Sequence, residues 1–566
     1  MPTNWILPLQ MLLPMAFAGI LLLPIKALNE RKIAWLYSAF TSMVSLGVAI
    51  LIAIRFDWSN PGHVQIPGEF AWLPELGLRF SFGVDSISIA LLILTALLMP
   101  VVVVASLLEV KHDMRKFQFW LHVLEAALMG SFMARDLVFF YTCFEITLIP
   151  LFFLIAQFGH HDRLRAAKVM FFYAFTGSMV MLAGIFYVAW WGYQSQGAPW
   201  SGQWHWDIES LWAIGNTMSR TQQTCILGAF VLGLGIKTPL FPFHTWLPLV
   251  HTEAPTAGSV DLAGLVLKLG PYGLLRFAIP MLPLGVLVLA PWLGALAVIG
   301  VIAAALIAWV QTDAKKLVAY SSISHMGFAV LALFAFDKGS IGATGAMVYM
   351  LSHGLATGGL FICLGMLYDR FQTRDLDRLS GLAKIMPLWA FFFGIFAFAS
   401  VGLPGLSGFV GEFLCLIGSF GGRYDPAAVA GLPTFLGMAP ELWLPKVYAV
   451  LAGSGVVLAA IYVLHLLGRV AFGPLKRPFF ESTGEHGMDK THGHDLSSRE
   501  TAILVPLALA CLLIGIYPKP LTAALEPAVR GLCATVNGKL DALNPAIPAS
   551  TVSSSAASST APAEAP

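Results

Sequence analysis

The stretch GIKTPLFPFHTWLPLVHTEAPTAGSVDLAGLVLKLGPYGLLRF, residues 235–277, combines long apolar runs with two lysines and several prolines. Lys237 and Lys268 stand inside apolar segments, where an ionisable group costs at least about 2.5–3.5 kcal/mol on insertion scales. Pro239 follows two residues after Lys237. A proline inside a helix removes one backbone donor and clashes with the carbonyl group four residues earlier. The stretch therefore predicts an interrupted membrane helix beside a buried charge.

The composition of the whole chain is that of a membrane protein with many helices. Of its 566 residues, 57% are hydrophobic and only 11% are charged, and the mean hydropathy is +0.77. Soluble domains contain about 25% charged residues, so a water-soluble globule is excluded. The net charge of +2 gives no bias toward polyanions, and we expect no nucleic-acid partner. The predicted fold class is an all-α polytopic membrane protein surrounded by lipid.

Fourteen apolar segments predict about fourteen transmembrane helices, since one span needs about 20 apolar residues. They lie at residues 5–25, 33–54, 84–108, 117–133, 137–158, 169–192, 223–250, 256–280, 286–310, 315–336, 341–368, 385–420, 446–470 and 501–518. We expect five parts in the chain: three N-terminal spans (1–116), a first five-helix unit (117–280), a second (281–472), a cytoplasmic loop with the last span and a short external segment (473–544), and a disordered tail rich in Ala, Ser and Pro (545–566).

The basic residues predict how the chain is oriented. Twenty Lys and Arg residues lie in the loops that follow odd-numbered spans, and eleven lie on the opposite side, which includes both termini. Cytoplasmic loops carry an excess of Lys and Arg. We therefore expect a multi-pass protein of a bacterial cytoplasmic (inner) membrane with both termini on the outer, periplasmic side.

A second interrupted helix is predicted in FASVGLPGLSGFVGEF, residues 398–413, where Gly402 and Pro404 precede Glu412. Unwound backbone at membrane depth is tolerated only against protein or a water-filled cavity. Pro239 and Pro404 are five predicted spans apart, which indicates two five-helix repeats, spans 4–8 and 9–13. Because each repeat has an odd number of spans, the second is inverted relative to the first, a common arrangement in transporters.

Further ionisable side chains stand inside the predicted spans: Glu125, Glu145, His325, His353 and Glu412. A lysine–carboxylate pair whose separation changes alternates between holding and releasing a proton, and histidine titrates near neutral pH. The pattern favours a proton pathway. Two alternatives stay open: hydrogen bonds that join packed helices, worth about 0.6 kcal/mol each, and a sodium site built from carboxylates and freed carbonyl groups.

Several stretches carry a family resemblance: FEITLIPLFFLI (144–155), the opening stretch 235–277, KKLVAYSSISHMGF (315–328), MLSHG (350–354) and LPGLSGFVGEF (403–413). They resemble the antiporter-like membrane subunits of respiratory complex I, and the glutamate in the twelfth span is typical of the M type. The resemblance implies a proton-translocating subunit in the membrane arm of NADH–quinone oxidoreductase, a translocase that carries no redox chemistry on this chain.

The resemblance also implies roles for individual residues. Glu145 and Lys237 match the glutamate–lysine pair of the half-channel on the cytoplasmic side, and Lys268 matches the connecting lysine. His325 and His353 match the central polar relay, and Glu412 matches the terminal exit residue. Auxiliary acidic positions are Glu109, Glu125 and, as a separate hypothesis, Asp261.

The resemblance places the cofactors on other chains. NADH, FMN, iron–sulfur clusters and quinone are expected on partner subunits, and the partners in the membrane arm are L- and N-type antiporter-like subunits and small membrane subunits. Six cysteines without a C-x-x-C pair indicate small core residues rather than a metal or disulfide framework. The alternatives are a subunit of a multi-subunit Na⁺/H⁺ antiporter, a subunit of a related membrane hydrogenase or ferredoxin-dependent complex, and an assembly scaffold.

One departure from the family pattern concerns the seventh span. The family usually reads W-L-P-D-A-H, whereas here Leu249 and Val250 follow Pro248. An acidic residue occurs instead at Asp261, where an apolar residue is usual. We interpret Asp261 as a relocated carboxylate that helps to load protons.

Overall fold

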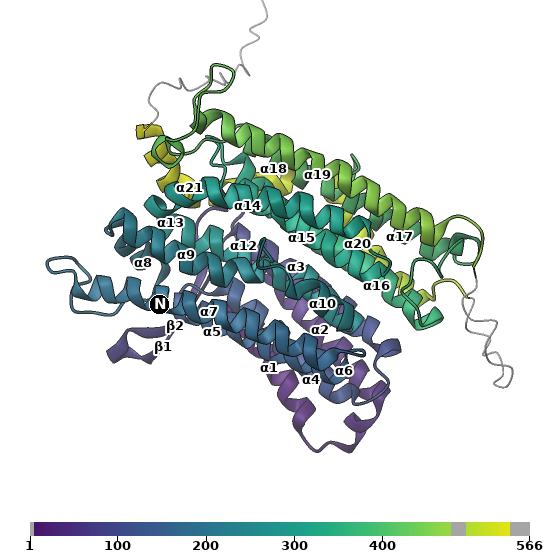
Figure 1. Cartoon of the computed structure of the whole chain (residues 1–566). Helices are drawn as coiled ribbons and strands as arrows, with labels where there is room; N and C mark the ends of the chain where they lie inside the picture. The colour runs from purple at the N-terminus through teal and green to yellow at the C-terminus, as the bar shows by residue number, and fades with distance from the viewer. Residues whose placement is uncertain (1–4, 477–493, 544–566) are drawn as a thin grey trace, which may run out of the picture.

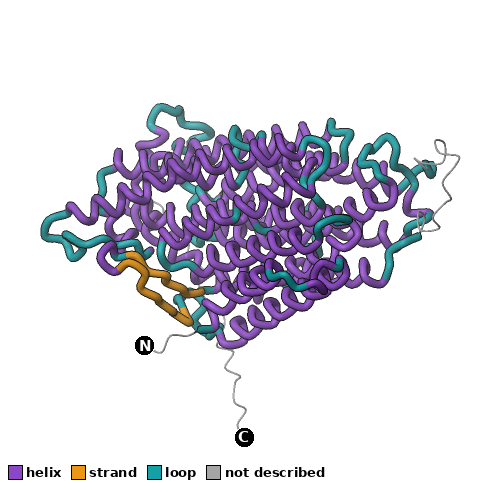
Figure 2. The backbone as a smooth tube through the Cα atoms, turned by 90° about the horizontal axis from the view of Figure 1, so that it is seen from below, coloured by secondary structure: helices purple, strands orange, loops and turns teal. Residues whose placement is uncertain are grey.

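Backbone polar groups in lipid must be hydrogen-bonded within the protein, which favours helices, and the chain is built almost entirely of them. The structure, a computed structural model, describes residues 5–476 and 494–543 (Figure 1). The long helices run side by side across the bundle (Figures 1 and 2). The predicted tail at residues 545–566 lies outside the described residues.

Ten helical segments of the described chain are long and apolar enough to cross a membrane. They are α2 (Arg31–Arg55), α3 (Ser86–Glu109), α5 with α6 (Leu137–Ile146 and Leu148–Phe158), α7 (Arg163–Gln194), α11 to α13 (Thr256–Met281), α14 (Pro283–Trp309), α15 (Ala314–Leu333), α16 (Ile341–Phe371), α19 (Pro440–Ala471) and α20 (Ser498–Ile516). The predicted helical membrane fold is confirmed.

The other four expected spans are shorter, more polar or interrupted helices. They are α1 (Ile6–Leu22), α4 (Met114–Met133), α9 with α10 (Arg220–Lys237 and Trp246–Glu253), and α17 with α18 (Pro387–Val401 and Ser407–Phe420). The total of fourteen spans and the division into two five-helix repeats stay predictions.

The helices are interrupted beside the buried charges. The seventh span leaves its helix between Lys237 and Trp246, and the twelfth between Val401 and Ser407, where the prolines and glycines predicted it. The eighth expected span is also irregular, since a 3₁₀ turn, Val266–Lys268, and a π turn, Leu274–Ala278, interrupt it. The signal for this third irregularity was Pro271 within a glycine-rich stretch.

The N-terminal residues and the C-terminal helix both contact the segment between α2 and α3, at one end of the bundle. A small antiparallel hairpin, β1 (Gln65–Leu73) and β2 (Leu78–Val84), lies there (Figure 2). Trp5 packs against Phe70 of this hairpin. The backbone of Pro527, in the C-terminal helix α21 (Lys519–Leu543), approaches Gly62. The hairpin and the length of α21 are features that the hydropathy pattern did not reveal.

The opposite end of the bundle carries the basic loops and their ion pairs. Arg370 on α16 pairs with Glu500 at 2.8 Å, and Arg374 lies 3.5 Å from Asp313. The expectation that all cysteines are core residues is wrong for Cys225, which is exposed on α9, whereas the other five are buried.

Candidate proton-transfer site

A buried unit of three side chains lies where α15, α16 and α18 pack together. The Nδ1 atom of His325 on α15 is hydrogen-bonded to the phenolic oxygen of Tyr349 on α16. The Tyr349 hydroxyl donates in turn to Oε1 of Glu412 on α18 over 2.5 Å. The His325 and Glu412 side chains also lie within 3.4 Å of each other. Each of these residues is at most 3% exposed, so the unit is shielded from lipid.

The interruption before α18 gives Glu412 its position. Gly402, the residue after α17, has a φ of +79°, a conformation that L side chains rarely adopt. A Cβ atom added there would lie 2.3 Å from Oε2 of Glu412. Glycine at this position therefore serves two purposes: it lets the chain turn between the half-helices, and it leaves room for the carboxylate.

Lys268 and His353 form a second buried contact. The ammonium group of Lys268 lies 2.7 Å from Nδ1 of His353 on α16, and it also donates to the carbonyl oxygen of Ala263. That carbonyl belongs to the last turn of α11 (Thr256–Gly264), just before the 3₁₀ turn that carries Lys268. The irregular eighth span thus supplies both the lysine and a backbone acceptor for it.

A small cavity separates the two contacts. It offers about 10 Å³ of space to the centre of a water molecule and is lined by His325, His353, Ser352, Thr357 and Ser400, among others. The rings of the two histidines are 5.8 Å apart between centroids, and Nε2 of His353 makes no hydrogen bond to any described residue. Space of about 10 Å³ is close to the minimum that one water molecule needs, and a water molecule there would bridge the histidines.

Lys237 lies at the interruption of the seventh span. Its ammonium group donates to the hydroxyl of Thr147 over 2.8 Å and lies 4.3 Å above the centre of the Phe144 ring. Thr147 is itself the residue at which α5 gives way to α6. The indole of Trp246 donates to the carbonyl oxygen of Ile236, so a carbonyl group near the end of α9 gains a side-chain partner.

Glu145 is near Lys237 but does not pair with it. The two side chains interact electrostatically, yet no ion pair between them is formed among the described residues. Glu145 is half-buried on α5, and its Oε1 atom is shielded and has no hydrogen-bond partner in the described chain. The same residues include no hydrogen bond that joins Lys237 to Lys268. The structure therefore brings Lys268, His353, His325 and Glu412 together and leaves Glu145 and Lys237 as a separate group.

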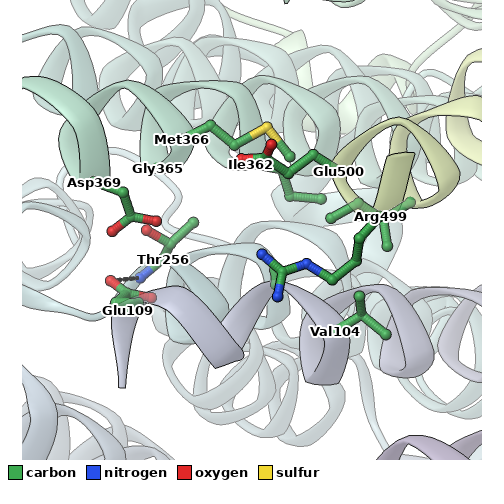
Figure 3. A pocket seen from close by; sticks show the side chains of 11 residues that line it. Val104, Glu109, Thr256, Ile362, Gly365, Met366, Asp369, Arg499 and Glu500 are labelled. Carbon is green, nitrogen blue, oxygen red and sulfur yellow. Dashed lines mark hydrogen bonds between the residues drawn. The ribbon is translucent and has the colours of Figure 1, made fainter. Parts of the chain in front are cut away.

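The auxiliary acidic residues lie in two places. Glu109, at the end of α3, accepts a hydrogen bond from the backbone N–H of Thr256 over 2.6 Å. It lines a small cavity, with about 20 Å³ of space for the centres of water molecules, together with Asp369, Arg499 and Glu500 (Figure 3). The cavity lies at the end of the bundle that the basic loops occupy, and apolar side chains such as Ile362 and Met366 complete its lining.

Glu125 and Asp261 are both fully buried. Glu125 pairs with Nδ1 of His122 at 3.1 Å, and Nε2 of that histidine lies 3.0 Å from the Thr41 hydroxyl. Asp261 interacts electrostatically with Glu125, but neither of its carboxylate oxygens has a hydrogen-bond partner among the described residues. Glu253, near the altered W-L-P motif, accepts from the backbone N–H of Asp162 at 2.7 Å.

Three site residues were missed by reasoning from the sequence: Thr147, Tyr349 and His122. Threonine and tyrosine are common in membrane helices and carry no charge, so they give no insertion-cost signal. His122 is an ionisable side chain inside a predicted span, as His325 and His353 are, and its position three residues before Glu125 was an available signal.

These features define a class of protein, the polytopic helical transporters whose titratable side chains are buried at interrupted helices. A family model described as "NADH:quinone oxidoreductase/Mrp antiporter, TM" matches residues 134–437. The chain is 36% identical over 546 residues to NADH-quinone oxidoreductase subunit M of Rhodobacter capsulatus, covering 94% of this chain and 97% of that protein. It is 35% identical over 501 residues to NADH-ubiquinone oxidoreductase chain 4 of Chondrus crispus, covering 88% and 92%. The chain belongs to the NADH:quinone oxidoreductase/Mrp antiporter family, in the group formed by subunit M and chain 4.

Solved structures agree with this assignment. A chain of respiratory complex I from Thermus thermophilus with bound NADH superposes with a TM-score of 0.76 at 29% identity, covering 94% of this chain and 99% of that one. A chain of the Mrp complex from Dietzia sp. DQ12-45-1b, at 19% identity and a TM-score of 0.75 over 96% and 100% of the two chains, shares the fold. The resemblance read from the sequence motifs is confirmed.

Proposed function

We propose that this chain is the proton-translocating M-type subunit of the membrane arm of an NADH-quinone oxidoreductase, with a relay of buried side chains as its pathway. The observation that carries the proposal is the buried row Lys268, His353, His325 and Glu412, joined by contacts of 2.7 and 3.4 Å and one hydratable cavity. Burying such groups is costly, and apolar packing alone would not require them.

Each relay residue has a distinct part in the proposal. Glu145 and Lys237 receive a proton on the side of the basic loops, with Glu109 as the auxiliary acid at that end. Lys268 carries the proton to His353, and the cavity water carries it to His325. Glu412, at the broken twelfth span, releases it toward the opposite side.

Redox chemistry belongs to other chains in this proposal. NADH, FMN, iron–sulfur clusters and quinone are held by partner subunits, and their reactions change the charge balance at the Glu145–Lys237 group. Antiporter-like L- and N-type subunits and small membrane subunits are the neighbours in the membrane. Cytoplasmic loops carry an excess of Lys and Arg, so in this proposal the end of the bundle with the basic loops faces the cytoplasm and both termini lie outside a bacterial cytoplasmic membrane.

The chemistry of the site favours protons over sodium ions. Sodium sites in transporters use backbone carbonyls and carboxylates, whereas the row from Lys268 to Glu412 presents a lysine, two histidines and the phenol of Tyr349 before its one carboxylate. Lysine and histidine carry protons and do not suit a hard cation while protonated. A role as one subunit of an Na⁺/H⁺ antiporter is therefore the weaker candidate, and co-purification of flavin and iron–sulfur subunits distinguishes the two.

The test is replacement of Lys237 in the assembled complex. Lys237→Ala is expected to remove most NADH-driven proton pumping into inverted membrane vesicles while the complex still assembles on native gels. Lys446→Ala is the matched control, because Lys446 is a partly buried lysine on α19 that donates to the Leu442 carbonyl, lies 5.4 Å from the centre of the Phe420 ring, and has no part in the proposed relay. Full pumping by an assembled Lys237→Ala complex would refute the relay.

A further inference from the structure

Tyr349 occupies the space between the two ends of the central unit. Its hydroxyl is within hydrogen-bond reach of both Nδ1 of His325 and Oε1 of Glu412. The phenol is one of few side chains that can accept and donate a hydrogen bond at the same oxygen. The phenol therefore lies in series between the imidazole of His325 and the carboxylate of Glu412.

The direct step from His325 to Glu412 is longer than either step of the route through the phenol. The two side chains are 3.4 Å apart, beyond the 2.7–3.2 Å usual for an N–H···O hydrogen bond. The step from the Tyr349 oxygen to Glu412 is 2.5 Å, which is within the range of an O–H···O bond. Proton transfer becomes much slower as the donor–acceptor distance grows, so the route through the phenol has the shorter individual transfer steps.

The far side of the histidine is held by other hydroxyl groups. Ser400 and Tyr462 lie 3.3 and 3.5 Å from Nε2 of His325, and Tyr462 is also 2.8 Å from the Ser321 hydroxyl. These contacts fix the orientation of the imidazole ring, so that Nδ1 faces Tyr349. Because Nε2 has its own partners, a proton that arrives at one ring nitrogen can leave from the other.

The backbone of α18 holds the phenol ring in place. A Cβ atom added at Gly411 would lie 2.6 Å from Cα of Tyr349 and 2.7 Å from its ring. The glycine thus lets α16 and α18 approach closely at the residue before Glu412. Tyr349 is 3% exposed, and its ring meets the His325 ring edge-on. A ring packed in this way keeps its hydroxyl between the two partners.

We propose that Tyr349 is a proton-transferring residue of the relay, a role that rests on the function proposed above. Protonated His325 gives its Nδ1 proton to the phenolic oxygen while the Tyr349 O–H proton moves to Oε1 of Glu412. One N–H bond and one O–H bond break, and two O–H bonds form. The phenol ends neutral, and one proton has passed from imidazolium to carboxylate without any oxidation or reduction.

The test compares two tyrosines in the full complex. Tyr349→Phe removes only the hydroxyl and is expected to reduce NADH-driven vesicle acidification, relative to NADH oxidation, at least about tenfold. Tyr424→Phe is the matched control, because Tyr424 is equally buried and its hydroxyl has no hydrogen-bond partner in the described chain. The control is expected to pump like the wild type. Wild-type pumping by Tyr349→Phe would overturn the inference.

Two further variants keep the result interpretable. Glu412→Gln tests the proposed function itself: if it loses pumping while Tyr349→Phe retains it, only the role of the tyrosine fails, and if it pumps normally, the exit and the tyrosine both fail. Should Tyr349→Phe not assemble, 3-fluorotyrosine at position 349 preserves the shape but makes the phenol more acidic. A pumping profile displaced to lower pH would then support the inference, and an unchanged profile would overturn it.

Discussion

Lys237 donates its hydrogen bond to Thr147, over 2.8 Å, and not to the carboxylate of Glu145 two residues earlier on the same span. The structure thus holds the lysine against a neutral hydroxyl at a helix junction. The carboxylate is close enough to act electrostatically, and no ion pair joins it to Lys237 in the described chain. A pair that alternates between contact and separation is what the proposed proton loading requires.

Thr147→Val tests this arrangement, because valine keeps the shape and removes the acceptor. A hydrogen bond to a charged group contributes about 1.5–3 kcal/mol, so we expect pumping to fall about tenfold or more. Thr147→Ser retains the hydroxyl and should pump nearly as the wild type does. Thr142→Val is the control on the same helix, since that exposed hydroxyl bonds only the Val138 carbonyl. Equal pumping by the valine and serine variants at position 147 would contradict the role of the hydroxyl.

Gly402→Ala is expected to impair the exit end of the relay. The left-handed backbone costs a non-glycine residue about 1–2 kcal/mol, and the new methyl group would displace the Glu412 carboxylate. We expect a modest loss of assembled complex and a loss of pumping several times larger. Gly394→Ala, on α17 where an added Cβ meets nothing within 4 Å, should change neither quantity. Normal pumping at normal complex content would show that Glu412 does not need this space.

Asp261→Asn tests the hypothesis that the Asp261 carboxylate replaces the usual acid of the seventh span. Both of its oxygens are buried without a hydrogen-bond partner in the described chain, a state that costs about 1–3 kcal/mol or more. We expect the variant to pump less and to tolerate heat at least as well as the wild type. Measurements of vesicle acidification and of the thermal dissociation midpoint check the two parts. Undiminished pumping would end the idea that this carboxylate loads protons.

Asp136 predicts a pH dependence of stability outside the membrane spans. It caps the N-terminus of α5 by accepting from the N–H groups of Val138 and Phe139. Burial, aided by the nearby Asp207, raises the pKa of Asp136 to about 7. The folded protein therefore holds a proton that the unfolded chain has already lost, and stability falls as the pH rises from about 4 to about 7.

Asp136→Asn should remove that fall, because asparagine caps a helix equally well and cannot ionise. The measurement is the thermal dissociation midpoint of the purified complex at pH 5 and pH 8. We expect the wild type to lose more between these pH values than the variant does. The same loss in both proteins would show that this carboxylate does not set the pH dependence.

Insertion cost and backbone chemistry account for what the sequence could predict. Lysine, glutamate and histidine are expensive in lipid, so Lys237, Lys268 and Glu412 stood out, and Pro239 and Gly402 marked the interruptions beside two of them. The family motifs then supplied the roles. The irregular eighth span was not predicted, although Pro271, three residues after Lys268, carried the same signal.

The hydrogen-bond partners of the buried side chains could not be predicted, because they depend on how packed helices are rotated about their axes. Tyr349 lies 63 residues from Glu412 along the chain, and Thr147 lies 90 residues from Lys237. A rotation of one helix by a few tens of degrees would give either residue a different neighbour. The hairpin before α3 was missed for another reason: it is short and lies between spans, where the hydropathy pattern carries no information.

The partial exposure of Glu145 has a consequence for how this protein is studied. The other relay residues draw their surroundings from their own chain, whereas the dielectric environment of Glu145 is completed by whatever adjoins α5 in the assembly. In an isolated chain purified in detergent, detergent molecules would surround the exposed side of this carboxylate. Its titration there would depend on the detergent as much as on the protein. Proton affinities at the receiving end are therefore properties of the assembled arm, and only measurements on the intact complex can report them.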